Sequence, residues 1–269
     1  MSLPADNEIV VEVSRAHGAA GIGRVIGAGE HGAALLGKRV LVGPIDPCGE
    51  CEVCRRGGAP VCPLAKRRDT IGAQVTVAAR WVVALDDALP LDDELGAHVA
   101  GAIVLAYTLY ARSNLAPRDP VVVIGAAGDL VARYLVQIHV AKGITPTVVI
   151  DPDDARDTAL ADLALARGAA LARIGAHASD ADARATVGAT FAAQQIGNRP
   201  WRVLATAPTA TPRAAALCGP RATLTVRAGG PDLPADLAAR EVTIFTVAAA
   251  HPDLVVEVAA MCAKGEIVG

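Results

Sequence analysis

Four cysteines within fifteen residues constrain this chain more than any other feature. Cys48, Cys51, Cys54 and Cys62 follow the spacing C-x2-C-x2-C-x7-C on a glycine-containing loop. Four thiolates on such a loop can close a tetrahedron around Zn²⁺, and four protein ligands leave no open position for water or substrate. The spacing therefore predicts one structural zinc ion per chain, with no chemistry at that ion.

Other interpretations of the cysteine loop remain open. Iron–sulfur clusters also use four cysteines, although the bacterial ferredoxin run usually continues to C-x3-C-P, and a loop without metal is the third alternative. Disulfides fit poorly, because the sequence shows no secretory leader and its composition is typical of a reducing compartment. Cys218 and Cys262 lie in apolar surroundings and are predicted to be core residues.

The composition indicates a globular protein that binds neither nucleic acid nor membranes. Apolar residues make up 52 % of the chain but aromatic residues only 3 %, so alanine, valine and leucine must form the core. The net charge is −3 and the two signs are well mixed, without a basic stripe. No uninterrupted apolar run approaches the roughly 18 residues of a membrane span. We expect a soluble, cytoplasmic protein.

The hydrophobic pattern changes near residue 112 and predicts two domains. Before about residue 85, short stretches such as Glu8–Ser14 alternate polar and apolar residues, as half-buried strands do. A helix is expected over 94–111. Beyond Pro120, apolar runs such as Val121–Ile124 alternate with helical segments, which is typical of a parallel, doubly wound sheet. We therefore expect an α/β protein with a β domain over 1–112 and a doubly wound domain over 113–269.

The run Gly125–Val131 follows the first strand of the second domain and resembles a dinucleotide-binding turn. Glycines permit a tight turn, the helix N-terminus offers amides to a pyrophosphate, and an acid after the next strand binds ribose hydroxyls. Asp151 lies 23 residues beyond Gly128 and favours NAD over NADP. The predicted cofactor-binding residues are Gly125, Ala127, Gly128, Leu130 and Asp151.

The turn departs from the glycine fingerprint in ways that weaken it. Ala127 and Leu130 stand where the pattern G-x-G-x-x-G has glycines. Asp129 places a carboxylate at the helix N-terminus, where it would repel a pyrophosphate. Two interpretations remain open: NAD binds here, or Asp129 caps the helix and no nucleotide binds.

Taken together, the cysteine loop and the turn resemble the zinc-containing alcohol dehydrogenases of the medium-chain dehydrogenase/reductase superfamily. The residues that carry the resemblance are Gly37–Val42, Pro47–Gly57, Val61–Pro63 and Asp119–Asp151. The resemblance implies a GroES-like β domain that carries the zinc lobe at 48–62, followed by a Rossmann domain. It also implies a homodimer through the outer Rossmann strand, and the uncharged run Val242–Val247 is the expected edge.

The departures from this family concern its catalytic zinc. Family members bind that ion through a cysteine after the first strand, a Gly-His-Glu segment, and a cysteine or aspartate on the connecting helix. Here no cysteine precedes Cys48, His17–Gly21 retains at most a histidine, and Gly101 stands at the helix position. The sequence also ends at Gly269, although family members normally send one more segment back to the catalytic domain. We therefore expect no C-terminal segment that returns to the first domain. No catalytic residue is therefore assigned.

Three functions remain open on these grounds. The first is an NAD(H)-linked dehydrogenase or reductase without catalytic zinc, in which Tyr107 or Tyr110 would donate a hydrogen bond. The second is a non-catalytic relative, a pseudoenzyme, that uses the fold to bind a small molecule or a partner. The third is an inactive remnant of a dehydrogenase. The sequence does not identify a ligand.

Overall fold

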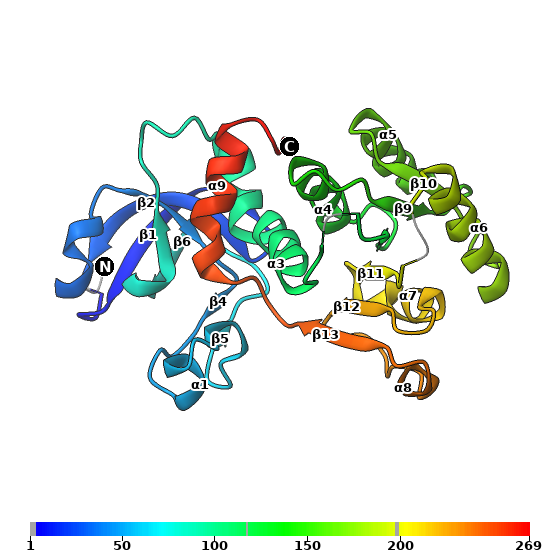
Figure 1. Cartoon of the computed structure of the whole chain (residues 1–269). Helices are drawn as coiled ribbons and strands as arrows, with labels where there is room; N and C mark the ends of the chain where they lie inside the picture. The colour runs from blue at the N-terminus through cyan, green and yellow to red at the C-terminus, as the bar shows by residue number, and fades with distance from the viewer. Residues whose placement is uncertain (1–3, 117, 197–198) are drawn as a thin grey trace. The chain divides into compact units, whose positions relative to one another are not determined.

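The computed structural model describes residues 4–116, 118–196 and 199–269 and divides the chain into two compact units (Figure 1). Unit 1 contains the residues up to Leu105 together with Ala250–Gly269, and unit 2 contains Ala106–Ala249. The predicted division differs, because it assigned residues 250–269 to the Rossmann domain. These residues form a helix that packs against Val99–Ile103 of unit 1.

Unit 1 is built on a five-stranded antiparallel sheet in the order β6-β1-β2-β3-β7. The strands are β1 (Glu8–His17), β2 (Ala20–Ala28), β3 (Arg39–Val42), β6 (Gln74–Ala78) and β7 (Val82–Ala84). Alternate residues of β1 point inward, so that Ile9 and Val11 are fully buried. They form a core cluster with Val25, Val40, Val42 and Val77.

Short elements surround the cysteine loop of unit 1. A two-stranded ladder of β4 (Ile45–Asp46) and β5 (Lys66–Arg67) closes its base. Within the loop lie α1 (Glu52–Arg55) and the 3₁₀ turn η2 (Ala59–Val61); η1 (Glu30–Leu35) and η3 (Ala79–Trp81) lie outside it. We call residues 43–68 the cysteine lobe.

The predicted helix over 94–111 is present but is not regular. It begins as α2 (Asp93–His98), widens into a π-helical turn η4 (Val99–Ile103) and continues as α3 (Val104–Arg112). The last elements are η7 (Pro252–Leu254) and α9 (Val255–Ala263), and α9 packs against η4 (Figure 1). The expectation that no C-terminal segment returns to the first domain is therefore wrong.

Unit 2 contains a six-stranded parallel sheet in the order β10-β9-β8-β11-β12-β13. In chain order this is 3-2-1-4-5-6, the arrangement of the Rossmann fold, and its topological switch point lies between β8 and β11. The strands are β8 (Val121–Ile124), β9 (Thr147–Ile150), β10 (Ala170–Arg173), β11 (Arg202–Ala205), β12 (Thr223–Arg227) and β13 (Thr243–Val247). The predicted α/β fold class is confirmed.

The helices of unit 2 connect these strands. They are α4 (Leu130–Ala141), α5 (Thr158–Ala166), α6 (Asp180–Ala193), α7 (Thr211–Leu217) and the short α8 (Asp236–Ala239), with 3₁₀ turns η5 (Ala155–Asp157) and η6 (Pro208–Ala210). β8 and β9 are buried along their whole length, as expected for central parallel strands.

One helical stretch, Asp93–Arg112, is long and apolar enough to cross a membrane by length and composition alone. Its most apolar window is 61 % buried inside the structure. A core helix of a globular protein has the same property, so the stretch is weak grounds for a membrane span.

Candidate metal and cofactor sites

The four cysteines of the lobe converge on one point. Their Sγ atoms all lie within 4.8 Å of one another, with separations of 3.6 Å for Cys48–Cys62, 3.8 Å for Cys51–Cys62 and 4.0 Å for Cys48–Cys54. A tetrahedron with Zn–S bonds of about 2.3 Å has edges of about 3.8 Å. The sulfur atoms therefore have the spacing that a tetrahedral zinc ion requires.

The lobe also controls the ionisation of its thiols. Backbone amides of Glu50 and Cys51 donate to Cys48 and lower its pKa from 9.0 to about 6, whereas burial raises the pKa of Cys54 to about 12. A divalent cation would favour the thiolate form of all four groups. The donor set and its geometry fit structural zinc, and four sulfur ligands leave no open coordination position.

The positions expected to bind a catalytic zinc do meet in unit 1, but without ligand atoms. A Cβ atom added to Gly101 in the π-helical turn would lie 3.1 Å from the Cβ of Ala20, which belongs to the segment that replaces Gly-His-Glu. Alanine and glycine offer no side-chain donor to a metal. In the described part of the chain, only the lobe cysteines bring three or more ligand atoms within 4.8 Å.

The histidine considered at the sequence level, His17, contacts another histidine. Its ring centroid lies 4.4 Å from that of His98, and His98 Nε2 lies 3.6 Å from Oε1 of Glu94. Arg15 pairs with the same carboxylate. The carboxylate thus has a guanidinium partner, and the two imidazole rings are tilted by 36° to each other.

The turn after β8 has the shape of a dinucleotide turn. Gly128 has φ +75°, a left-handed conformation that favours glycine. A Cβ at Gly125 would lie 2.7 Å from Thr206 Oγ1. Of the predicted cofactor residues, Gly125, Ala127 and Asp151 line one cleft of about 330 Å³ at the carboxyl ends of β8 and β9, whereas Gly128 and Leu130 do not.

Asp129 occupies the N-terminus of α4, where a pyrophosphate would bind. Its Oδ1 accepts a hydrogen bond from the amide of Val131 at 2.9 Å, which confirms the predicted helix cap. Its Oδ2 accepts one from Thr206 Oγ1 at 2.5 Å and lies 3.0 Å from the position of a Cβ on Gly125. The carboxylate is therefore held above the glycine turn by two hydrogen bonds.

Sequence reasoning missed Thr206, which contacts Gly125 and Asp129 of the turn, and Arg156, which lines the cleft. Thr206 follows β11, the neighbour of β8 at the switch point, so the register of the two strands brings it beside the turn. Arg156 lines the cleft and makes a bidentate pair with Asp154, at 3.0 and 2.6 Å, which lowers the pKa of Asp154 to about 2. Its position beyond Asp151, in the loop after β9, was the available sequence signal.

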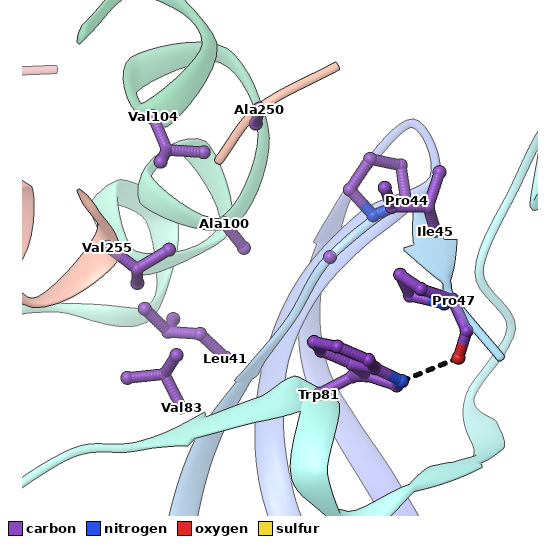
Figure 2. Close-up of a pocket in the computed structure, with 11 residues that line it drawn as sticks. Leu41, Pro44, Ile45, Pro47, Trp81, Val83, Ala100, Val104, Ala250 and Val255 are labelled. Atoms are coloured by element: carbon purple, nitrogen blue, oxygen red, sulfur yellow. Dashed lines mark hydrogen bonds between the residues drawn. The ribbon is translucent and has the colours of Figure 1, made fainter. Parts of the chain in front are cut away.

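A second cavity lies wholly within unit 1 and is apolar. This pocket, about 40 Å³ in volume, is bounded by strand, lobe and helix residues (Figure 2). Its lining consists of Leu41, Gly43, Pro44, Ile45, Pro47, Trp81, Val83, Ala100, Val104, Ala250 and Val255. The indole Nε1 of Trp81 donates to Pro47 O at 2.6 Å, so the polar atom of that ring is already paired. The pocket suits a small apolar group.

Comparison with known proteins points to dehydrogenases. None of the protein-family models matches the chain. A curated relative, 2-dehydro-3-deoxy-L-galactonate 5-dehydrogenase of Pseudoalteromonas atlantica, is 31 % identical over 159 residues, which are 56 % of this chain and 44 % of the relative. The match thus spans less than half the length of that relative.

Solved structures match nearly the whole chain. Galactitol-1-phosphate dehydrogenase of Escherichia coli gives a TM-score of 0.77 at 16 % identity and covers 100 % of this chain and 85 % of its own. A cobalt- and zinc-bound alcohol dehydrogenase of Pyrobaculum aerophilum gives 0.75 at 17 % identity, with 100 % and 84 % coverage. An NADH complex of an alcohol dehydrogenase of Escherichia coli CFT073 gives 0.75 at 19 % identity, with 99 % and 83 % coverage. At these identities the likeness concerns the fold.

Proposed function

Because this chain has the fold of the zinc-containing medium-chain alcohol dehydrogenases, we propose that it is a dehydrogenase-like protein with a structural zinc and no catalytic zinc. On this proposal Cys48, Cys51, Cys54 and Cys62 hold the ion. The protein has little or no activity as a zinc-dependent alcohol dehydrogenase, because such an enzyme needs about three protein ligands and an open coordination site. Any remaining activity would be an NAD(H)-linked hydride transfer without metal.

One observation carries this proposal: the contact between Gly101 and Ala20. Gly101 stands where the family resemblance implies a ligand, and Ala20 belongs to the segment that replaces Gly-His-Glu; neither residue has a side-chain donor atom for a metal. The Asp129 carboxylate adds support, because it occupies the place of a pyrophosphate.

Metal analysis of the purified protein tests the zinc half of the proposal. We expect about one zinc ion per chain, and a Cys54→Ser variant should contain none. Two zinc ions per chain would show that a second site exists and would contradict the loss of catalytic zinc.

Calorimetry with NAD⁺ and NADH tests the cofactor half. We expect no measurable binding at micromolar cofactor, because the pyrophosphate must displace or approach the Asp129 carboxylate. Micromolar affinity for either form would instead support the metal-free dehydrogenase.

The apolar pocket supports a second candidate function, a non-catalytic protein that binds a small apolar molecule. Trp81 lines this pocket and serves as a reporter, since the chain has only two tryptophans, Trp81 and Trp201. In a Trp201→Phe variant, a small hydrocarbon such as toluene should change Trp81 emission with saturation. A matched Ala100→Phe variant, which fills the pocket, should abolish the response; a response that survives this substitution would place binding elsewhere.

We also infer a cytoplasmic homodimer that pairs through β13, at residues Val242–Val247. Support comes from the sheet order, which places β13 at the edge beside β12. Ile244 is 39 % exposed on this strand, and an uncharged bare edge favours pairing with another strand.

A further inference from the structure

Three consecutive residues at the entrance of the cysteine lobe are tied to η3 and the residue before it. The amide of Ala78 donates to Asp46 Oδ2 at 3.4 Å, and Trp81 Nε1 donates to Pro47 O at 2.6 Å (Figure 2). The guanidinium of Arg80 donates to the carbonyl oxygen of Cys48. The backbone on both sides of the first cysteine is therefore fixed by groups that lie more than thirty residues away in the sequence.

Arg80 also contacts a second residue of the lobe, Gly49. A side chain on Gly49 would collide with its guanidinium carbon and both terminal nitrogens. Gly49 also has φ +75°, a left-handed conformation that favours glycine. The guanidinium thus rests directly against the Cys48–Gly49 peptide, in the turn that delivers Cys48 and Cys51 to the site.

The ring of Trp81 holds Arg80 in this position. The guanidinium carbon lies 5.6 Å from the centroid of the indole ring, within the range of a cation–π contact. The indole is in turn anchored by its bond to Pro47 O. Adjacent side chains of one short turn therefore bind adjacent carbonyl groups of the lobe.

The charge of Arg80 suits the site that it contacts. A zinc ion with four thiolate ligands carries a net charge of −2, and a neighbouring cation reduces the repulsion among the sulfur atoms. Arg80 is exposed, so solvent screens this attraction and its hydrogen bond to the ligand loop matters more than its charge. An arginine within the lobe, Arg56, is exposed and does not share these contacts: its Nε donates to Glu52 Oε1 at 2.7 Å.

We propose that Arg80 is a positioning residue of the zinc site: it holds the Cys48 backbone in its metal-binding conformation and slows release of the ion. This inference rests on the proposal that the four cysteines bind zinc. Outer-sphere partners of metal ligands typically change metal affinity about 10–100-fold when removed. Because Arg80 acts through one exposed hydrogen bond, we expect an effect near the lower end of that range.

The test measures the rate at which the purified protein releases zinc to a chromophoric chelator. Arg80→Ala should release zinc about tenfold faster than wild type. Arg80→Gln keeps a donor without the charge and should lie between the two. Arg56→Ala removes an arginine from the same lobe and should release zinc at the wild-type rate. Equal rates for Arg80→Ala and Arg56→Ala would overturn the inference.

Cobalt substitution gives a second readout that does not depend on release. The absorption bands of a four-thiolate Co²⁺ site report its geometry, and they should shift in Arg80→Ala but not in Arg56→Ala. Arg80→Lys covers the case in which the alanine variant does not fold. Lysine keeps the positive charge but lacks the planar guanidinium group. Unchanged bands and wild-type release in Arg80→Ala and Arg80→Lys would assign the residue no role. A wild-type protein without zinc would instead refute the metal site itself.

Discussion

Asp129 shows how one side chain changes the use of a binding turn. Gly128 keeps a left-handed φ of +75°, and the neighbouring Asp129 carboxylate accepts hydrogen bonds from Val131 and Thr206 at the N-terminus of α4, where the family resemblance implies phosphates. A helix N-terminus satisfies any nearby anion, and an internal carboxylate is always present at high effective concentration. The turn therefore resembles a cofactor site in which the Asp129 carboxylate of the chain itself accepts the available hydrogen bonds.

Substitution of Asp129 tests this directly. Asp129→Gly removes the carboxylate and should increase affinity for NADH at least about tenfold, or about 1.4 kcal/mol. Asp129→Asn keeps the cap and removes the charge, so it should give a smaller gain. Calorimetry of the three proteins measures the change. Equal affinity in all three would mean that the carboxylate does not control the turn.

His139 provides a pH-dependent contribution to stability. Its side chain is fully buried, Nδ1 lies 2.7 Å from Leu135 O, and the ring meets Tyr110 edge-on at 5.5 Å. Burial lowers the pKa of His139 from 6.5 to about 4. Between these values the unfolded chain binds a proton that the folded chain excludes, so stability is lost as pH falls from about 6.5 towards 4, by up to roughly 3 kcal/mol.

Urea unfolding at pH 7 and pH 5 measures this loss for unit 2. In a Trp81→Phe background, emission reports on Trp201, which packs against Phe191 in that unit. His139→Leu should reduce the difference in unfolding free energy between the two pH values. An unchanged difference would assign the pH dependence to other groups.

At the scale of elements, the predicted runs Val121–Ile124 and Val242–Val247 match β8 and β13 to within one residue. Runs such as Val121–Ile124 are bounded by proline or glycine and buried on both faces, so their sequence signal is strong. β4 and β5 were missed because two residues carry no periodicity. The π-helical turn Val99–Ile103, which packs against α9, was also missed, because such turns are rare and the sequence analysis found no signal for one.

The same limit applies to the candidate sites. Local spacing identified the four cysteines and the Asp129 cap, because each is contained in one short segment. Thr206 and Arg80 act on groups that lie 77 and 32 residues away. Such pairs depend on the register of strands and turns, which one sequence does not specify.

The edge strand β13 carries a prediction about assembly. The amide of Thr243 donates to Ala222 on the side of β12, so by alternation the amide of Thr246 points to the open edge. Thr246→Pro removes that outward donor and should convert the dimer to a monomer. Light scattering after size exclusion gives the mass. Thr246→Val keeps the amide and should remain dimeric; a monomeric wild type would contradict the proposed interface.

At the scale of the whole molecule, each unit has a core cluster and a candidate site of its own. All four lobe cysteines belong to unit 1, whereas Asp129 and Asp151 belong to unit 2. A zinc ion in the lobe would therefore stabilise unit 1 only, and its removal should destabilise that unit.

Hydrogen exchange after chelation tests this division. Removal of zinc should increase amide exchange across the cysteine lobe, residues 43–68, because structural zinc sites contribute directly to folding. Protection in β8, β9 and β11 should not change. Equal loss of protection in both units would show that they unfold as one cooperative body.

The helix α9 has a consequence for the order in which the protein is made. Unit 1 starts the chain but includes Ala250–Gly269, which the ribosome adds only after Ala106–Ala249. The Rossmann sheet thus has all its strands while the β domain still lacks the helix that covers Val99–Ile103. Domains fold as units during synthesis, so the second unit of the sequence is the first that can be completed.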